Sequence, residues 1–348
     1  MENKKLIWIN YISHHVYTWW FYFFNKYFLF DYYDNNSKDI LIWNKKKLLL
    51  NKNISVFWNS LRFVNDKNIR INKNDILVIW DIFSLLLVFK YLFRKNTIFY
   101  TEIIVRKNDK LLKKIIVIFY RLFFINKKIL VPTLESFNIM KKVSKKIFYL
   151  PQIFYWDIHK NDSLNDEKLK IIFVWNIPYW AKNLYFLLDT LEELDNENID
   201  FEIWLCWRIN EEHLIRVNRY KDKLWKKLNY LWEFWHKELS KEYLKHNLFI
   251  LPSLSDPIWA VVLEAMAHSL PIIVSENVWA KSYIHENKNW YVYKDKEDLK
   301  NKILFFLNNR KRLEFWIKSY ELVKENHYYK NEKLINSKKE EFDKFITK

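Results

Sequence analysis

The stretch 251–280 constrains the fold of this chain more than any other part of it, because it reads as strand, turn, helix, turn and strand. Asp256 stands directly before Pro257, and apolar residues then recur at helical spacing over 260–268. Proline is favoured at the first position of a helix, and aspartate is a good N-cap. The pattern therefore predicts a helix that begins near Pro257 and ends before Pro271, where the next strand opens.

Units of the same kind recur along the whole chain. The sequence predicts strands at 4–10, 75–79, 97–100, 129–133, 146–151, 170–174, 201–206, 228–231 and 248–251. Helices are predicted between them at 21–30, 83–93, 109–128, 183–194, 211–219 and 237–245, followed by 296–308 and a charged terminal helix. Alternation of this sort is typical of parallel sheets that carry helices on both faces. The expected fold class is therefore α/β.

A length of 348 residues suits two domains. The polar, turn-rich residues 156–168 read as the linker between them. We expect a Rossmann-like domain on the acceptor side at 1–160 and a donor-binding domain at 161–325. The remaining 326–348 is expected to be a C-terminal helix, for which a return to the first domain is one option.

The glycine content of the chain is unusual, because the sequence contains no glycine and 18 tryptophans. Ordinary usage would give roughly 24 glycines, and tight turns with positive φ have few other solutions. Several tryptophans stand where glycine is expected: in the Trp19-Trp20 loop and at Trp175, Trp279 and Trp290. The interpretation is that UGA codons read as glycine in the source are rendered as tryptophan. A genuinely tryptophan-rich protein is the alternative, and Trp204 is the position best suited to a real tryptophan.

Charge and cysteine usage narrow the class of protein further. One cysteine, Cys206, excludes a disulfide framework and suggests a reducing compartment. No signal peptide or transmembrane helix is predicted, so we expect a cytoplasmic protein. The net charge of +17 suggests acidic partners such as nucleotide phosphates, anionic lipid or nucleic acid.

The segment 109–128 is both basic and apolar. One interpretation is a core-packed helix whose lysines extend to solvent. The other is a basic amphipathic surface that lies on an anionic membrane, which would place the protein at the inner face of the cell membrane. The candidate membrane residues are Lys110, Lys113, Lys114, Arg121, Lys127 and Lys128.

Three places in the second half of the chain point to a bound anionic ligand. Lys182 stands at a helix start just beyond a strand, where charge and backbone N–H groups together can hold a phosphate. Asp256 and Glu264 are eight residues apart, which is about 12 Å along a helix, so they would contact opposite ends of an elongated ligand. Trp279 follows the next strand, and a glycine there would let the backbone approach a sugar or phosphate closely. The alternatives are that Lys182 is a surface lysine, that Asp256 is only an N-cap and that Glu264 is a surface carboxylate.

These residues resemble the retaining glycosyltransferases of the GT-B fold, glycosyltransferase family 4, once the tryptophans are read as glycine. The similarity spans nearly the whole chain and is strongest over 170–325. Asp256 through Glu264 matches the E-x7-E signature of that family, with Asp in place of the first Glu. The glycine positions of the family fall on Trp19-Trp20, Trp175, Trp207, Trp232, Trp259, Trp279 and Trp290.

The resemblance implies two Rossmann-like domains facing a central cleft and the transfer of a hexosyl group from a nucleotide-diphosphate sugar to a glycan or lipid-linked acceptor. It implies no cofactor and no metal, and no nucleic acid as a partner. Lys182 would hold the departing diphosphate, Glu264 the ribose and Asp256 the hydroxyls of the transferred sugar. The donor would also be lined by Trp175, Asn176, Trp259, Ala260, Trp279, Trp19 and Trp20.

Departures from the family pattern leave other functions open. Asn176 stands where an arginine often supports the lysine, Asp256 is one methylene short, and Ser269 fills a usual glycine position. A GT-B-like epimerase or an inactive relative is therefore one alternative. A basic, aromatic-rich nucleic-acid-binding protein is another, although the charges are spread along the chain.

Overall fold

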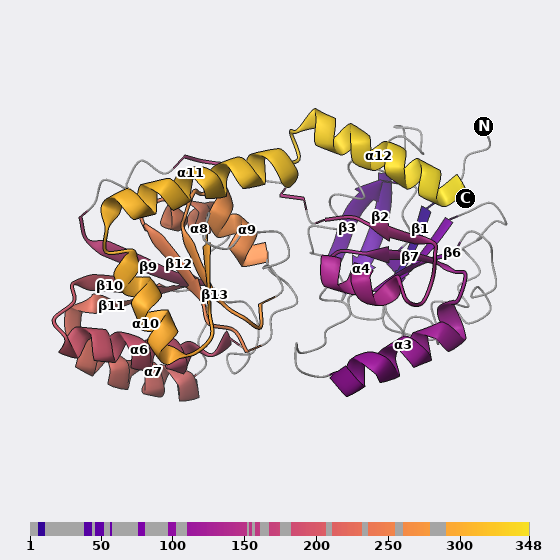
Figure 1. Ribbon diagram of the computed structural model, residues 1–348. Coiled ribbons are helices and arrows are strands. Elements are labelled where there is room, and N and C mark those ends of the chain that lie inside the picture. Colours follow the sequence, from indigo (N-terminus) through magenta and orange to yellow (C-terminus); the bar gives the residue numbers. More distant parts are fainter. Residues whose placement is uncertain are drawn as a thin grey trace. The chain divides into compact units, whose positions relative to one another are not determined.

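A computed structural model shows two compact units, and each is described by itself (Figure 1). Unit 1 contains Met1–Tyr155 together with Tyr329–Lys348, and unit 2 is Trp156–Tyr328. The structure describes residues 6–10, 38–43, 46–51, 56–57, 76–80, 97–101, 110–151, 153–154, 157–160, 167–174, 182–206, 211–231, 236–254, 260–278 and 290–347.

Unit 1 contains a six-stranded parallel sheet with the strand order β4-β1-β5-β6-β7-β8. Its strands are β1 (Leu6–Asn10), β4 (Val56–Phe57), β5 (Ile76–Trp80), β6 (Thr97–Tyr100), β7 (Lys128–Val131) and β8 (Ile147–Tyr149). An antiparallel pair, β2 (Lys38–Trp43) and β3 (Lys46–Asn51), forms a second, two-stranded sheet. Strands β6 and β7 are buried along their whole length, as expected for strands in the middle of a parallel sheet.

The described helices of unit 1 are α3 (Lys110–Phe124), α4 (Leu134–Met140) and α12 (Glu332–Thr347). Helix α4 begins at an N-cap, Thr133, whose side chain accepts a hydrogen bond from the backbone N–H of Ser136 at 3.1 Å. Helix α12 comes from the far end of the chain and packs against β8. There Phe342 and Phe345 each lie with their ring centroids 5.5 Å from that of Phe148.

Unit 2 contains a second six-stranded parallel sheet, with the order β11-β10-β9-β12-β13-β14. Its strands are β9 (Leu169–Val174), β10 (Phe201–Cys206), β11 (Leu228–Leu231), β12 (Leu248–Leu251), β13 (Ile272–Ser275) and β14 (Trp290–Tyr293). Strands β12 and β13 are buried at every residue. Continuous apolar runs of this kind belong to strands covered on both faces.

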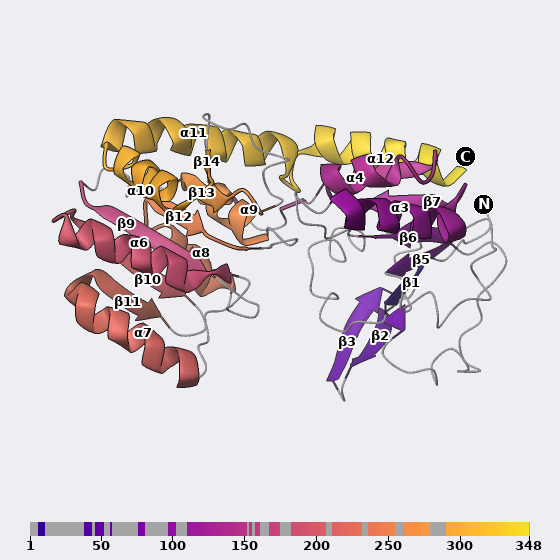
Figure 2. The same cartoon turned by 60° about the horizontal axis from the view of Figure 1, so that its bottom comes forward.

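Helices cover the two faces of this sheet (Figures 1 and 2). Helices α6 (Leu184–Asn196), α7 (Glu211–Leu224) and α10 (Lys296–Phe305) lie together on one face. Helices α8 (His236–Tyr243), α9 (Ala260–Ala267) and α11 (Asn309–Asn326) lie on the other face, where α9 contacts α11. A short 3-10 helix, η6 (Trp225–Lys227), joins α7 to β11.

The predicted α/β class is confirmed, since both large sheets are parallel and alternate with helices along the chain. The helices predicted at 21–30 and 83–93 lie outside the described residues. The antiparallel pair β2–β3 was not predicted, although its two strands are separated by only Asn44 and Lys45, a spacing typical of a hairpin. Among the helices in the described part of the chain, none is both long and apolar enough to cross a bilayer.

Left-handed backbone identifies two positions that favour glycine. Ser269 has φ 67°, and it fills a position that is usually glycine in the family that the sequence resembles. Trp225 has φ 47° and a side chain that is 71% exposed. For residues with a Cβ, left-handed conformation costs roughly 1–2 kcal/mol. Asparagine, which occupies the other described left-handed positions, tolerates it best.

Replacing Trp225 with Gly is expected to raise the free energy of unfolding by about 1 kcal/mol, because glycine adopts positive φ without steric cost. Urea unfolding would measure the change. Trp225→Ala is the matched control, since it removes the indole but keeps the Cβ. If the alanine variant were as stable as the glycine variant, the gain would not come from the backbone.

Candidate functional site

The order in which the chain adds strands to the sheet of unit 2 reverses between β9 and β12. From β9 the chain proceeds to β10 and β11 on one side and then returns to β12, β13 and β14 on the other. In open α/β sheets ligands bind at the carboxyl ends of the strands, at this kind of topological switch point. The residues that follow β9 and β12 are therefore the place to look for a site.

Lys182 follows β9 and comes just before α6. Its side chain is only 4% exposed, and such deep burial is unusual for a lysine. Asn183, the N-cap of α6, has a left-handed backbone and makes no capping hydrogen bond with its side chain. The lysine thus stands at a helix N-terminus, where unsatisfied N–H groups and the helix dipole favour an anion.

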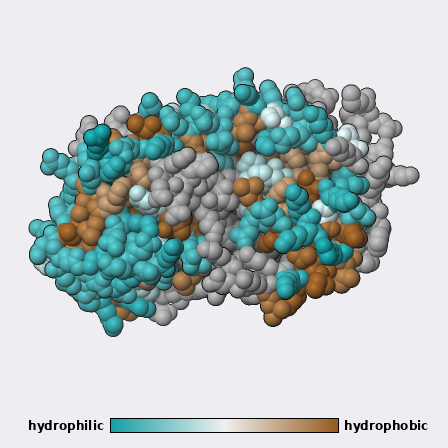
Figure 3. All heavy atoms as spheres, in the orientation of Figure 1, coloured by the Kyte–Doolittle hydropathy of each residue, from teal (hydrophilic) through white to brown (hydrophobic). Residues whose placement is uncertain are grey.

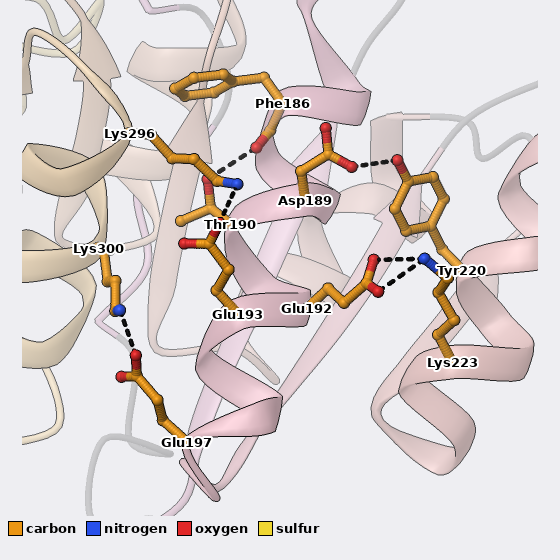
Figure 4. A network of polar contacts seen from close by, with 10 residues as sticks. All are labelled: Phe186, Asp189, Thr190, Glu192, Glu193, Glu197, Tyr220, Lys223, Lys296 and Lys300. Carbon is orange, nitrogen blue, oxygen red and sulfur yellow. Dashed lines mark hydrogen bonds and ion pairs between the residues drawn. The ribbon is translucent and has the colours of Figure 1, made fainter.

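Helix α6 is fixed by polar contacts with its two neighbours (Figure 4). On the α7 side, Lys223 donates to both carboxylate oxygens of Glu192, at 2.7 and 2.9 Å. On the α10 side, two ion pairs join Lys296 to Glu193 and Lys300 to Glu197. Each exposed pair contributes little to stability by itself. Together they hold the direction of α6, and so the position of Lys182 at its N-terminal end.

Glu264 lies on α9, which follows β12. The sequence left a surface carboxylate as one interpretation of this residue, but the side chain is only 6% exposed. One of its oxygens, Oε2, accepts a hydrogen bond from the Tyr243 hydroxyl at 3.2 Å. Burial raises the pKa of Glu264 to about 7, and the hydrogen bond from Tyr243 opposes that rise. A carboxylate in this state titrates near neutral pH, which is typical of functional sites.

A buried histidine connects α9 to α8 beside this carboxylate. His268 Nδ1 lies 2.7 Å from the Glu264 carbonyl oxygen, and its Nε2 lies 2.5 Å from Ser240 Oγ. Because a carbonyl can only accept, Nδ1 carries the proton and Nε2 accepts from the serine hydroxyl. Burial lowers the pKa of His268 to about 4, so the ring is neutral.

Sequence reasoning missed Tyr243 as a neighbour of the site. Its ring is buried and stacks on the His268 ring, with centroids 5.2 Å apart. Burial, followed by the charges of Glu264 and Cys206, raises the pKa of the Tyr243 hydroxyl well above its ordinary value. The hydroxyl therefore stays protonated and serves as a donor to Glu264. No local signal identifies Tyr243, because it lies on a different helix, 21 positions before its partner.

The C-terminal ends of β12 and β13 are also tied to each other and to α9. The Ser275 hydroxyl donates to the Ser253 carbonyl oxygen, and both serines are buried. Ser269, just after α9, donates through Oγ to the carbonyl oxygen of His159 at 2.9 Å. The backbone N–H of His159 in turn donates to the Ala267 carbonyl oxygen at 2.8 Å. Two hydrogen bonds thus connect the end of α9 to His159.

The predicted site residues divide into two groups. Lys182 and Glu264 are both buried and follow β9 and β12, the two strands at the switch point, and Ala260 is the first residue of α9. The other predicted positions lie outside the described residues: Trp19, Trp20, Trp175, Asn176, Asp256, Trp259 and Trp279. Within the described residues, no group of three His, Cys, Asp or Glu side chains is placed to hold a metal ion.

The candidate membrane residues fall into two sets, those in or just after α3 and Lys128. Lys110, Lys113, Lys114 and Arg121 belong to α3, and Lys127 follows that helix. Lys128 differs from them, because it opens β7 and is only 5% exposed. Its Nζ donates to the Ile346 carbonyl oxygen of α12 at 2.5 Å. Lys128 therefore joins α12 to the sheet, whereas Lys114 and Arg121 are exposed, so its assignment as a membrane residue is wrong.

The site combines a buried cation at a helix N-terminus with a buried carboxylate across a switch point. The first can bind a phosphate, and the second can accept hydrogen bonds from hydroxyl groups. Two units with parallel α/β sheets are the architecture of the GT-B glycosyltransferases.

Comparison with known proteins gives the same class. Residues 154–322 match the family described as glycosyl transferases group 1. No curated protein matches the chain.

Solved structures with the same fold are similar over nearly the whole chain. Sucrose-phosphate synthase from Thermosynechococcus elongatus has a TM-score of 0.71 at 12% identity, with 99% of each chain covered. HepE from Anabaena, in complex with UDP, has a TM-score of 0.70 at 10% identity, with 99% of this chain and 100% of that chain covered. TarM of S. aureus has a TM-score of 0.62 at 17% identity, and the match covers 90% of this chain but 62% of TarM.

Proposed function

We propose that the chain is a family 4 glycosyltransferase that moves a hexosyl group from a nucleotide-diphosphate sugar to a glycan or lipid-linked acceptor with retention of configuration. The observation that carries the proposal is that Lys182 and Glu264, which follow the two strands at the switch point of unit 2, are both buried. Both residues lie within 154–322, the segment that matches glycosyl transferases group 1. A protein of similar fold, HepE from Anabaena, forms a complex with UDP and glucose.

The proposed reaction breaks the bond between the anomeric carbon of the sugar and the diphosphate oxygen, and it joins that carbon to an acceptor hydroxyl oxygen whose proton leaves with the diphosphate. Negative charge then develops on the diphosphate, and a cation placed beforehand at that position stabilises the transition state. Lys182, with the N-terminus of α6, would supply that stabilisation without a metal. Glu264 would accept hydrogen bonds from the ribose hydroxyls, and Asp256 would contact the hydroxyls of the sugar.

The remaining donor contacts in this proposal come from Trp175, Asn176, Trp259, Ala260 and Trp279, with Trp19-Trp20 on the acceptor side. We propose that glycine stands at the tryptophan positions in the native protein, as UGA recoding implies. Two features support this: the chain has no glycine at all, and Trp225 is both left-handed and exposed. Glycine would leave room for the donor at each of these turns.

Peptide mass spectrometry of the native protein tests the recoding. Each tryptophan that is really glycine makes its peptide lighter by one indolylmethyl group. We expect glycine at Trp175, Trp180, Trp259, Trp279 and Trp290. Tryptophan at all five positions would contradict the recoding and leave the donor site filled by side chains.

Incubation of the native protein with a panel of nucleotide-diphosphate sugars tests the activity. We expect release of the nucleoside diphosphate, and transfer to an acceptor with the anomeric configuration of the donor preserved. Epimerised donor without transfer would support the epimerase alternative. Salt-sensitive binding of oligonucleotides without binding of nucleotide sugars would support the nucleic-acid alternative.

A further inference from the structure

Helix α3 of unit 1 exposes a row of large apolar side chains. Apart from the adjacent pair Ile118 and Phe119, they recur at intervals of three or four residues, so they lie on one face of the helix and its following turn. Two of them, Leu111 and Leu122, are 70% and 74% exposed. Figure 3 shows hydrophobic atoms gathered where Figure 1 places α3. This surface, here called the α3 stripe, consists of Leu111, Ile115, Ile118, Phe119, Leu122 and Ile125.

The opposite face of α3 anchors the helix to unit 1. Phe124 is buried with its ring centroid 4.5 Å from that of Phe99 on β6. The Tyr120 ring stacks on Phe124 at 5.0 Å, and its hydroxyl lies 3.0 Å from Thr101 Oγ1. One face of α3 therefore packs against the core of the unit, and the α3 stripe on the other face is exposed to solvent. A core-packed helix was one interpretation of this segment, and it does not explain that second apolar face.

Cations lie beside the stripe. Lys114 and Arg121 are exposed on α3, and Arg121 Nε donates to the Lys142 carbonyl oxygen at 2.8 Å. That bond brings the turn between α4 and β8 alongside α3. The turn adds four exposed lysines: Lys141, Lys142, Lys145 and Lys146.

Acidic residues are scarce in the same part of the chain. Helix α3 contains none, and Glu135 is the sole acidic residue of the sequence between 110 and 150. The α3 stripe is therefore bordered by charge of one sign. An apolar helix face bordered by lysine and arginine is typical of helices that lie in the plane of a membrane interface.

We propose that the α3 stripe and its neighbouring lysines dock unit 1 on an anionic lipid membrane. The apolar side chains would enter the boundary between headgroups and acyl chains, and the lysines would face lipid phosphates. A second copy of the chain fits this surface less well. A symmetric dimer would bring the same cations together across the interface, where like charges repel. The docking surface does not depend on the transfer reaction.

Vesicle sedimentation of the full chain tests this proposal. Vesicles that contain phosphatidylglycerol are expected to retain the protein at low salt at least tenfold better than purely zwitterionic vesicles. Ile118→Ser combined with Leu122→Ser should lower retention at least tenfold, since two apolar side chains no longer insert. Lys114→Glu combined with Lys142→Glu should lower it at least tenfold at low salt and much less at high salt.

Ile215→Ser combined with Ile317→Ser is the matched control, because both residues are exposed apolar side chains of unit 2. This variant should bind vesicles as the unchanged chain does. Equal loss in the control, or no retention of the unchanged chain by anionic vesicles at low salt, would overturn the proposal. A dimer that dissociates in the stripe variant, without any vesicle binding, would assign the surface to a second copy instead.

Discussion

Replacing Glu264 with Gln is expected to stabilise unit 2 by up to about 3 kcal/mol above pH 7. Burial raises the pKa of this carboxyl from 4.5 to about 7. Between these two values the unfolded chain has lost the proton while the folded chain still holds it. The unfolded state then binds fewer protons, so the free energy of unfolding falls as pH rises through this window, by about 1.4 kcal/mol for each pH unit.

Glutamine has nearly the same shape as glutamic acid and never ionises, so the free energy of unfolding of the variant does not fall in this way as pH rises. Hydrogen exchange of the α9 and β12 amides would measure the opening free energy at pH 4 and at pH 8. The two proteins should be equally protected at pH 4 and differ at pH 8. Glu321→Gln, at an exposed position of α11, is the control and should change neither. A difference as large at pH 4 as at pH 8 would contradict the titration.

The same carboxylate should make nucleotide binding depend on pH. If ribose hydroxyls donate to Glu264, they favour its ionised form, and binding releases a proton. The affinity of the unchanged protein for UDP should then fall as pH drops below about 7, which is the pKa of Glu264 in the protein without bound nucleotide. Glu264→Gln should bind UDP tenfold to about a hundredfold more weakly at pH 8, which is the range expected for one hydrogen bond to a charged group. Calorimetric titration at several pH values would measure both effects.

Replacing Lys182 with Met is expected to lower the rate of transfer by about 10²–10³-fold. A single donor aimed at developing negative charge has this effect when it is removed from an active site. Methionine keeps the length and volume of the buried side chain, so unit 2 should remain folded. Initial rates of nucleoside diphosphate release, measured with acceptor present, would give the ratio.

Lys223→Met is the matched control for this experiment. Lys223 pairs with Glu192, beyond the middle of α6 and away from its N-terminal end (Figure 4). Its loss should leave the rate of transfer unchanged. Equal rates for Lys182→Met and the unchanged protein would remove Lys182 from the proposed mechanism, while equal losses in both variants would indicate a general effect of charge on unit 2.

Much of the fold could be predicted from the sequence, because parallel strands buried on both faces appear as unbroken apolar runs. Strands β12 and β13 are examples, each bounded by a turn or a proline. The orientation of α3 could not be predicted in this way. Both of its faces are apolar, so periodicity alone does not say which face meets the core. The contacts of Phe124 with Phe99 and of Tyr120 with Thr101 decide it.

The candidate site could be predicted where a single segment carries the signal. Lys182 and Glu264 each follow a recognisable strand, and Ser269 occupies a position whose positive φ explains why glycine is usual there. Tyr243 could not be found, because its role depends on how α8 packs against α9. The raised pKa of Glu264 likewise depends on burial by residues distant in the sequence.

Helix α12 has a consequence for the order in which the protein is made and folded. Phe342 and Phe345 cover Phe148, and Lys128 bonds to the Ile346 carbonyl oxygen, so the last helix completes the first unit. Unit 2 is one continuous segment, and all of it leaves the ribosome before α12 does. Domains usually fold during synthesis from the N-terminus onward. In this chain unit 2 can finish folding first, while unit 1 is completed only after α12 has been translated.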